Sequence, residues 1–245
     1  MRKRNLATAG RGLASLAGIL FLVFLFATTT AQAQGPGRAA RMTPEQLKAA
    51  WALEARHVAG KLGLAEEATG KLVKAYTDAQ TAYTEAVNKK REELRAGGDR
   101  EGARGAMRTA FEEIRKSERD KFATALAGFL TEEQAKTALG QLGGFSNSLD
   151  RMVHVLAGFK LEDKQVKAFD LVFAYSLEQA KLWTPGTGEQ QDFAALREKM
   201  TALKTKLDTD LAEILSNEQL ETWKQATTFR GRGAGGGGQG ARREE

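Results

Sequence analysis

Two long apolar stripes with helical spacing, separated by a glycine-rich break, constrain the fold of this chain more than any other feature. Over about 65–96, apolar and small residues recur every three or four positions, as on one face of an α-helix. The pattern stops at the Gly-Gly-Asp sequence of 97–99 and resumes over about 102–129. Each arm is about 40 Å or more long at ~1.5 Å per residue, so the pair predicts a long antiparallel helical hairpin. The stripes contain Leu64, Ala68, Leu72, Ala75, Ala79, Tyr83, Ala86 and Leu94, then Met107, Phe111, Ile114, Phe122, Leu126 and Phe129.

The second half of the chain repeats this arrangement on a smaller scale. Residues 161–183 carry an apolar stripe, and a Thr-Pro-Gly-Thr-Gly turn follows at 184–188. Seven apolar residues from Phe193 to Ile214 then step by three and four, close to a coiled-coil seam, with Asp210 beside it. The chain has only three prolines and long stretches of Ala, Glu, Lys, Leu and Arg, which disfavours sheet. We therefore expect an all-α fold of long antiparallel helical hairpins.

The N-terminus has the pattern of a secretory signal peptide. A basic segment at 1–11 precedes fifteen mostly apolar residues at 13–27, and the small-x-small sequence Ala31-Gln32-Ala33 follows. An uncleaved membrane anchor is the alternative, but the apolar run is shorter than the ~20 residues that a spanning helix needs. No cysteine follows the run, so no bacterial lipoprotein anchor can form. We predict cleavage after Ala33, a mature chain without a membrane span, and a periplasmic or secreted location.

The net charge of +6 comes from the ends of the chain. Residues 1–33 carry +4, the tail at 230–245 carries +2, and Arg38 and Arg41 add two more, whereas 42–229 holds 27 basic and 29 acidic residues. A folded body that binds nucleic acid is therefore not supported by charge. The Gly/Arg tail resembles RGG-type RNA-binding segments. In an exported protein we expect it to be a disordered, flexible tail instead.

The chain has no cysteine and two histidines, His57 and His154. This composition excludes disulfide scaffolds, thiolate metal sites, cysteine nucleophiles and thiol redox chemistry. It also excludes a zinc site with three local His or Cys ligands. The acidic residues are dispersed along amphipathic helices, and no catalytic constellation stands out. We expect no enzymatic activity, no cofactor and no metal.

Three short motifs share the residue pattern of a capped helix start. Each has a large apolar residue, then Ser or Thr at the N-cap, and Gln three positions later. The hydroxyl can accept from the N3 amide while the Gln side chain reaches back to the N-cap amide. The motif residues are Met42, Thr43 and Gln46, then Leu130, Thr131 and Gln134, then Leu215, Ser216 and Gln219. We expect these residues to stabilise helix ends.

The arrangement of these motifs indicates an internal repeat. Residues 57–64 resemble 154–161 at an offset of 97, and the motif at 130–134 matches that at 215–219 at an offset of 85. The second hairpin is thus twelve residues shorter than the first. We read two diverged copies of one unit. The predicted organisation is a signal peptide (1–33), a linker (34–42), a first helical hairpin unit (43–145), a second (146–229) and a disordered tail (230–245).

The repeated unit resembles the Spy/CpxP family of periplasmic proteins over roughly residues 57–228. The family's mark is an L-T-x-x-Q motif twice per protomer, flanking a helical hairpin, after a signal peptide. The downstream motif is intact at Leu130–Gln134 and near-intact at Leu215–Gln219, whereas the upstream motif is degraded at 64–68 and 161–165. The resemblance implies a thin curved cradle of two protomers. It also implies an ATP-independent chaperone, a stress-response modulator or a sensor of zinc, nickel or cobalt.

A basic and apolar segment near the first hairpin tip is a candidate surface for clients or partners. Its residues are Arg100, Arg104, Met107, Arg108 and Phe111, with Arg115 and Arg119 continuing the basic character. A mixed surface of this kind can attract an unfolded client by charge and hold it by apolar contact. The alternative is a solvated tip in which Arg108, Glu112, Lys116 and Asp120 make ordinary i,i+4 pairs.

The histidines and tryptophans are weaker candidates. His57 and His154 occupy equivalent repeat positions, so they could meet, and Glu54 and Asp150 could complete a metal site. We favour shared ancestry or polar helix packing over a metal site, since no His-rich segment follows the signal peptide. The tryptophans, which are more often core residues or partner anchors than ligands, are Trp51, Trp183 and Trp223.

Together these features predict two tandem units that form a monomeric, intramolecular pseudo-dimer. The leading function is an extracytoplasmic holdase-type chaperone or envelope-stress binding protein that acts on unfolded or envelope proteins. One alternative is a regulatory or metal-sensing module of an envelope signalling system. Another is a structural envelope component.

Overall fold

The computed structural model describes residues 42–96, 102–183 and 193–228, and all helices and contacts below lie in those ranges. This part of the chain contains α-helices, one short 3₁₀ helix and no strand, so the expected all-α class is confirmed. The helices are α1 (Pro44–Lys61), α2 (Glu66–Ala96), α3 (Gly102–Ala127), α4 (Glu132–Leu142), α5 (Asn147–Gly158), η1 (Glu162–Lys164), α6 (Gln165–Trp183), α7 (Phe193–Ala212) and α8 (Asn217–Thr227).

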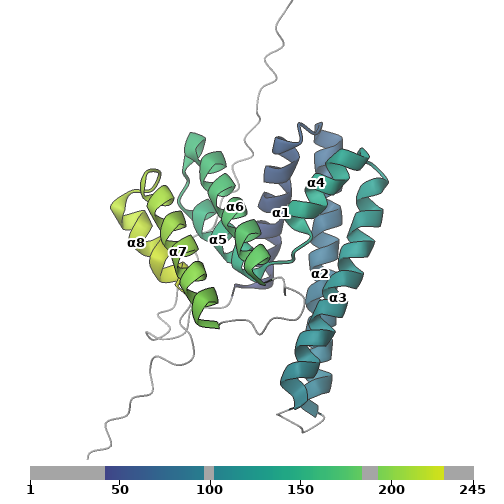
Figure 1. Cartoon of the computed structure of the whole chain (residues 1–245). Coiled ribbons are helices and arrows are strands. Elements are labelled where there is room, and N and C mark those ends of the chain that lie inside the picture. The colour runs from purple at the N-terminus through teal and green to yellow at the C-terminus, as the bar shows by residue number, and fades with distance from the viewer. Residues whose placement is uncertain (1–41, 97–101, 184–192, 229–245) are drawn as a thin grey trace, which may run out of the picture. The chain divides into compact units, whose positions relative to one another are not determined.

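The long helices α2 and α3 pack along each other, as do α6 and α7 (Figure 1). In α2 the buried residues recur every three or four positions, so one stripe faces the core. In α3 the buried aromatic and aliphatic residues Phe122 and Leu126 lie near its C-terminal end. Between Val87 of α2 and Ala110 of α3 the described side chains are half-buried or exposed. The ends of both helices next to residues 97–101 therefore contribute little to the core.

The helices form two sets with the same pattern of neighbours. In the first set α1 contacts α2 and α4, and α3 contacts α2 and α4. In the second set α5 contacts α6 and α8, and α7 contacts α6 and α8. The main contact between the sets joins α1 to α5. This contact is where the buried polar residues described below are found.

The buried core continues from one set to the other. It includes Ala55 and Val58 of α1, Tyr76 of α2, Leu149 of α5 and Phe173 of α6. The described residues belong to one compact unit. The sequence-based division at 145/146 falls in the short connection between α4 and α5. That division into units 43–145 and 146–229 stays a prediction.

The connection between α4 and α5 turns tightly. A Cβ atom on Gly143 would lie 2.6 Å from the carbonyl oxygen of Leu139, a contact that real side chains do not make. Phe145 follows with a φ of 46°, in the left-handed region that costs a residue with a Cβ. Its ring is buried and stacks on Tyr83 with centroids 5.0 Å apart. Aromatic burial thus compensates for the backbone conformation at this turn.

The predicted signal peptide and Gly/Arg tail lie outside the described residues. In the described part of the chain, no helix has both the length and the apolar character needed to cross a bilayer. The 184–188 turn also lies outside the described residues, between α6 and α7.

Candidate functional site

All three predicted capping motifs have reciprocal hydrogen bonds at helix starts. At α1 the Gln46 amide donates to Thr43 Oγ1 at 3.2 Å, and the Thr43 amide donates to Gln46 Oε1 at 2.8 Å. Thr131 and Gln134 make the same pair of bonds at α4, with distances of 3.3 and 3.1 Å. Ser216 and Gln219 do so at α8, at 3.3 and 2.9 Å. The motifs therefore satisfy amides that a helix start otherwise leaves unpaired.

The third motif makes an additional long-range contact. Gln219 Nε2 donates to the carbonyl oxygen of Phe159 at 3.3 Å, which ties the start of α8 to the C-cap of α5. The preceding Leu215 is buried, as is Leu130 before the second motif. The leucines thus pack in the core, while the N-cap hydroxyl residues are exposed. In the described residues the motif acts through helix ends and packing.

The structure describes part of the predicted basic tip. Arg100 and the side chain of Arg104 lie outside the described residues. Arg108 is exposed, and its Nε lies 3.4 Å from Glu112 Oε1 in an i,i+4 pair. Met107 is half-buried. Phe111 is also half-buried and packs against the core.

Phe111 already has a cationic neighbour from the opposite helix. The guanidinium carbon of Arg91 in α2 lies 5.7 Å from the Phe111 ring centroid. At this distance a cation–π attraction holds the two helices together. In the described residues the tip therefore shows the internal pairing of the solvated-tip alternative. Whether it also binds clients stays a prediction.

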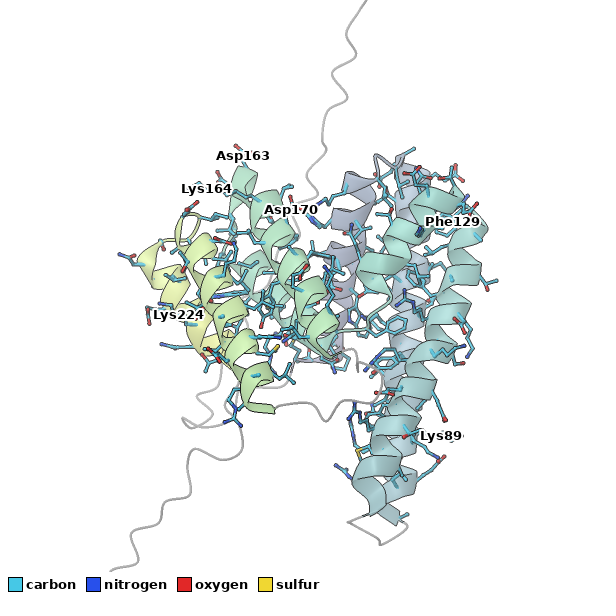
Figure 2. All side chains as sticks on the ribbon, in the orientation of Figure 1. Lys89, Phe129, Asp163, Lys164, Asp170 and Lys224 are labelled. Atoms are coloured by element: carbon cyan, nitrogen blue, oxygen red, sulfur yellow. The ribbon has the colours of Figure 1, made fainter. Side chains whose placement is uncertain are left out.

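His57 contacts α6. Its Nε2 lies 3.0 Å from Asp170 Oδ1 without the alignment of a full hydrogen bond, and Lys61 Nζ donates to the same oxygen at 2.8 Å. Asp170 is labelled on α6 in Figure 2. The His57 ring packs against Phe169 and Phe173, with centroids 5.6 and 4.9 Å away. Burial lowers the pKa of His57, and the Asp170 charge opposes that shift.

In the described residues, His57 and His154 do not form a metal centre with Glu54 and Asp150. These residues contain no group of three or more His, Asp or Glu side chains that could hold a metal ion. Burial lowers the pKa of His154, which sits on α5. Glu54 and Asp150 do come together, but beside Tyr76 and Trp51.

A buried polar cluster at the α1–α5 contact is the most unusual arrangement in the described residues. We call it the junction cluster, and it comprises Trp51 and Glu54 of α1, Tyr76 and Gln80 of α2, and Asp150 of α5. Glu54 is 0% exposed and Asp150 is 1% exposed. The Tyr76 hydroxyl donates to Glu54 Oε2 at 2.6 Å, and Gln80 Nε2 donates to the Tyr76 oxygen at 2.6 Å.

Several polar atoms of the junction cluster lack a hydrogen-bond partner in the described residues. They are Glu54 Oε1, both carboxyl oxygens of Asp150, and the indole nitrogen of Trp51. Burial raises the pKa of Glu54 well above its usual value, and the nearby Asp150 charge raises it further. Burial also raises the pKa of Asp150, to about 7. Both shifts favour the protonated acids, since buried charges without a counterion are costly.

The sequence suggests Glu54 and Asp150 as joint ligands of a metal site, whereas the structure brings them together as a buried acid pair. The available signal was position. Glu54 lies on the same helical face as Trp51, Ala55 and Val58, all of which are buried. An acid within an apolar stripe indicates burial. Its partner Asp150 follows ninety-six positions later on another helix, and the repeat equivalence of His57 and His154 is the signal that placed the two acids near each other.

Two of the tryptophans are core residues. Trp51 is buried in the junction cluster, and Trp223 is fully buried in α8. Trp223 Nε1 donates to Asp208 Oδ1 at 2.7 Å, and Lys204 Nζ lies 5.5 Å from its ring centroid. The indole of Trp223 thus links α8 to α7. The side chain of Trp183 lies outside the described residues.

Helix α6 carries the large apolar side chains that are exposed in the described residues. Val166 is 61% exposed and Leu177 is 37% exposed. Leu177 lines a shallow, largely apolar pocket together with Ala174, Ala180 and the stems of Glu178 and Lys181. The apolar stripe of residues 161–183 predicts buried residues such as Phe169 and Phe173, and it does not identify the exposed Val166 and Leu177.

No protein-family model matches this chain, and neither curated proteins nor solved structures give a significant match.

Proposed function

We propose that this chain is an extracytoplasmic binding protein of the holdase type, which captures unfolded or envelope protein clients without nucleotide and without catalysing a reaction. The observation that carries the proposal is the exposure of two large apolar side chains on α6. Val166 and Leu177 are both exposed there. Eleven residues correspond to three helical turns, so the two side chains lie about 16 Å apart along the axis of α6. Phe173 lies between them on the same side and is buried against His57, so they form two separate apolar positions. We call the exposed residues Val166, Ala174, Leu177 and Lys181 the α6 face.

The chemistry of the α6 face suits weak and adaptable binding. Val166 and Leu177 can each contact a short apolar segment of a client. Such burial contributes a favourable free energy of roughly 25 cal/mol for each Å² of apolar surface removed from water. Lys181 and Glu178 are both exposed, and Lys181 Nζ lies 2.5 Å from Glu178 Oε1. Two separate apolar positions among charged neighbours support weak, reversible contact with clients of varied sequence.

The pattern of helix neighbours supports the tandem-repeat part of the proposal. Each set of four helices has the same order of contacts, and the sets meet through their first helices, α1 and α5. The equivalent residues Gly63 and Lys160, which follow these helices, both have left-handed backbones, with φ of 63° and 52°. On this reading the chain is an intramolecular pseudo-dimer of two Spy/CpxP-like units that needs no second chain.

The predicted signal peptide supports the location, and the location limits the mechanism. A chain exported after cleavage near Ala33 works where no ATP supply can be assumed. Clients must then be held and released by binding equilibria alone. The proposal requires no catalytic chemistry, since it rests on a surface and not on a reactive group.

The experiment is aggregation suppression of an unfolded model protein by the purified mature chain at near-stoichiometric ratio. We expect the wild-type chain to suppress aggregation and a Val166→Asp/Leu177→Asp variant to lose most of this activity. The matched control is Ala202→Asp/Thr205→Asp, which adds the same charge at exposed positions of α7. An Arg100→Glu/Arg104→Glu variant tests the basic tip as the second candidate surface.

The outcomes separate the candidate functions. Suppression that survives in the α6-face variant but not in the tip variant would move client binding to the tip. No suppression by the wild-type chain would overturn the holdase proposal. Selective capture of one envelope signalling protein, or a zinc or nickel site, would then favour the regulatory or metal-sensing alternative. If the chain neither suppresses aggregation, nor captures a signalling protein, nor binds a metal, the remaining alternative is a structural envelope component.

A further inference from the structure

The junction cluster has more buried acceptors than donors. Tyr76 supplies one O–H to Glu54 Oε2, and Gln80 supplies an amide to the Tyr76 oxygen. The indole N–H of Trp51 is a further donor beside Asp150, and it opposes the rise of the Asp150 pKa. Three carboxyl oxygens remain without a partner in the described residues: one on Glu54 and both on Asp150. A buried acceptor without a donor costs about 1–3 kcal/mol, and a buried ionised acceptor costs more. A proton held between the two carboxyl groups would supply a donor at that position.

No cation compensates the two acids among the described residues. Every ion pair made by a described Lys, Arg or His involves another acid, and Glu54 and Asp150 are in none of them. Glu118 of α3, the other buried acid, differs because Lys121 Nζ lies 2.7 Å from its Oε1. The acid pair at the junction therefore lacks the usual means by which proteins bury a carboxylate.

The neighbouring helices also provide no compensating charge. From α2 the groups facing the acids are Tyr76 and Gln80, and from α4 the buried side chains are apolar. On α1 itself, His57 and Lys61 contact Asp170 of α6. The remaining neighbours are Arg151 and His154, which are half-buried on α5, and Trp223, the buried residue of α8, whose indole donates to Asp208.

We propose that Glu54 and Asp150 share a proton at neutral pH, and that its loss at higher pH weakens the α1–α5 contact between the two sets of helices. The contact between α1 and α5 is therefore stronger at mildly acidic pH than at alkaline pH. With the proton in place, one acid donates to the other and the repulsion of two adjacent charges is absent. Without it, two carboxylates with almost no solvent contact face each other across the junction.

The direction of the pH dependence follows from linkage. The pKa of Asp150 in the folded chain is raised from its ordinary value of 3.8 to about 7, and that of Glu54 is raised as well. The folded state therefore binds more protons than the unfolded state in this interval, so stability falls as pH rises through it. For one proton the unfolding equilibrium constant rises by at most tenfold per pH unit. Burial lowers the pKa of His57 and of His154, and these shifts act in the opposite direction.

The test is urea denaturation of the mature chain at pH 5, 6, 7 and 8, followed by the fluorescence of the buried tryptophans. Because the histidines oppose the acids, the informative quantity is the difference between wild type and Asp150→Asn. We expect the ratio of the unfolding equilibrium constant of Asp150→Asn to that of wild type to fall by at least tenfold as the pH rises from 5 to 8. The control variant Glu118→Gln removes a buried acid that has a lysine partner, and its profile should parallel that of wild type.

Two further measurements keep the proposal falsifiable if Asp150→Asn does not fold. Glu54→Gln removes the other member of the pair and should have the same effect on the pH profile. In the unaltered chain, carboxyl ¹³C resonances of labelled Asp and Glu should include one that titrates above pH 6. Parallel pH profiles of wild type and both acid variants, or the absence of any carboxyl titrating above pH 5, would overturn the proposal.

Discussion

At the scale of single residues, the conformational demands of the α4–α5 turn can be tested with two glycines three positions apart. Gly140 lies within α4, and a Cβ there would meet nothing within 4 Å. Gly143 caps α4, and a Cβ there would lie 2.6 Å from the Leu139 carbonyl oxygen and 3.0 Å from its side chain.

We predict opposite effects for the two alanine substitutions. Gly140→Ala should stabilise the chain by about 0.5–1 kcal/mol, since alanine restricts the unfolded chain and suits a helix interior. Gly143→Ala should destabilise it by about 1–3 kcal/mol, since backbone or Leu139 must shift. Chemical denaturation of both variants measures the difference. Equal effects of the two substitutions would show that the turn relaxes around the added methyl group.

Tyr76 is the residue on which the hydrogen bonds of the junction cluster depend. Tyr76→Phe removes one hydroxyl, which leaves Glu54 Oε2 without its donor and Gln80 Nε2 without its acceptor. We expect a loss of about 1–3 kcal/mol, the range for a buried polar group left unsatisfied. Tyr83→Phe is the matched control, because Tyr83 is buried in the same helix and its ring stacks on Phe145. If Tyr76→Phe and Tyr83→Phe lowered the free energy of unfolding by similar amounts relative to wild type, the role given to the Tyr76 hydroxyl would be contradicted.

At the scale of helices, the three capping boxes define where α1, α4 and α8 begin. We predict that Thr131→Ala and Ser216→Ala each cost about 0.5–2 kcal/mol, as the loss of an N-cap usually does. Gln219→Ala should cost more than Gln134→Ala, because Gln219 also donates to the Phe159 carbonyl of α5. The measurement is the unfolding free energy of each variant. Loss of client binding with unchanged stability would instead identify the motif as a contact site.

The helices could largely be predicted from the sequence, because their signals are local. Apolar spacing and the Ser/Thr–x–x–Gln motifs lie within a few residues of the ends that they determine, and the expected helix at about 65–96 is found at Glu66–Ala96. The contact of α1 with α5 could not be predicted in this way. It depends on which stripes fit each other in space, and both stripes are apolar.

The candidate site was less accessible from the sequence than the helices. Arg108 and Phe111 were selected as a basic and apolar surface, yet Glu112 and Arg91 pair with them in the structure. Val166 and Leu177 were not selected, since exposure of one face depends on which helices cover α6. Glu54 illustrates the same limit, because its burial beside Asp150 arises only from the packing of two distant helices.

At the scale of the whole molecule, the two sets of helices depend on each other through α1 and α5. Ala50, Ala55, Val58 and Ala59 are almost completely buried in α1, and α2, α4 and α5 all pack against that helix. The chain connects the sets by only a few residues between α4 and α5. Such a short connection keeps the second set at high effective concentration near the first.

We predict that the mature chain is a monomer at micromolar concentration and that residues 42–145 alone are not a stable monomer. The isolated segment ends before α5, so the side of α1 that packs on α5 would face water, and Glu54 would lose its partner Asp150. The lost burial leaves a poorly folded chain or one that dimerises, with a second α1 in the place of α5. Sedimentation and circular dichroism of the mature chain and the fragment distinguish these states. A fragment that is monomeric and unfolds cooperatively at the same urea concentration as the mature chain would mean that the sets fold independently. In that case the α1–α5 contact would not be the basis of a pseudo-dimer, and the tandem cradle proposed for client binding would lose its structural support.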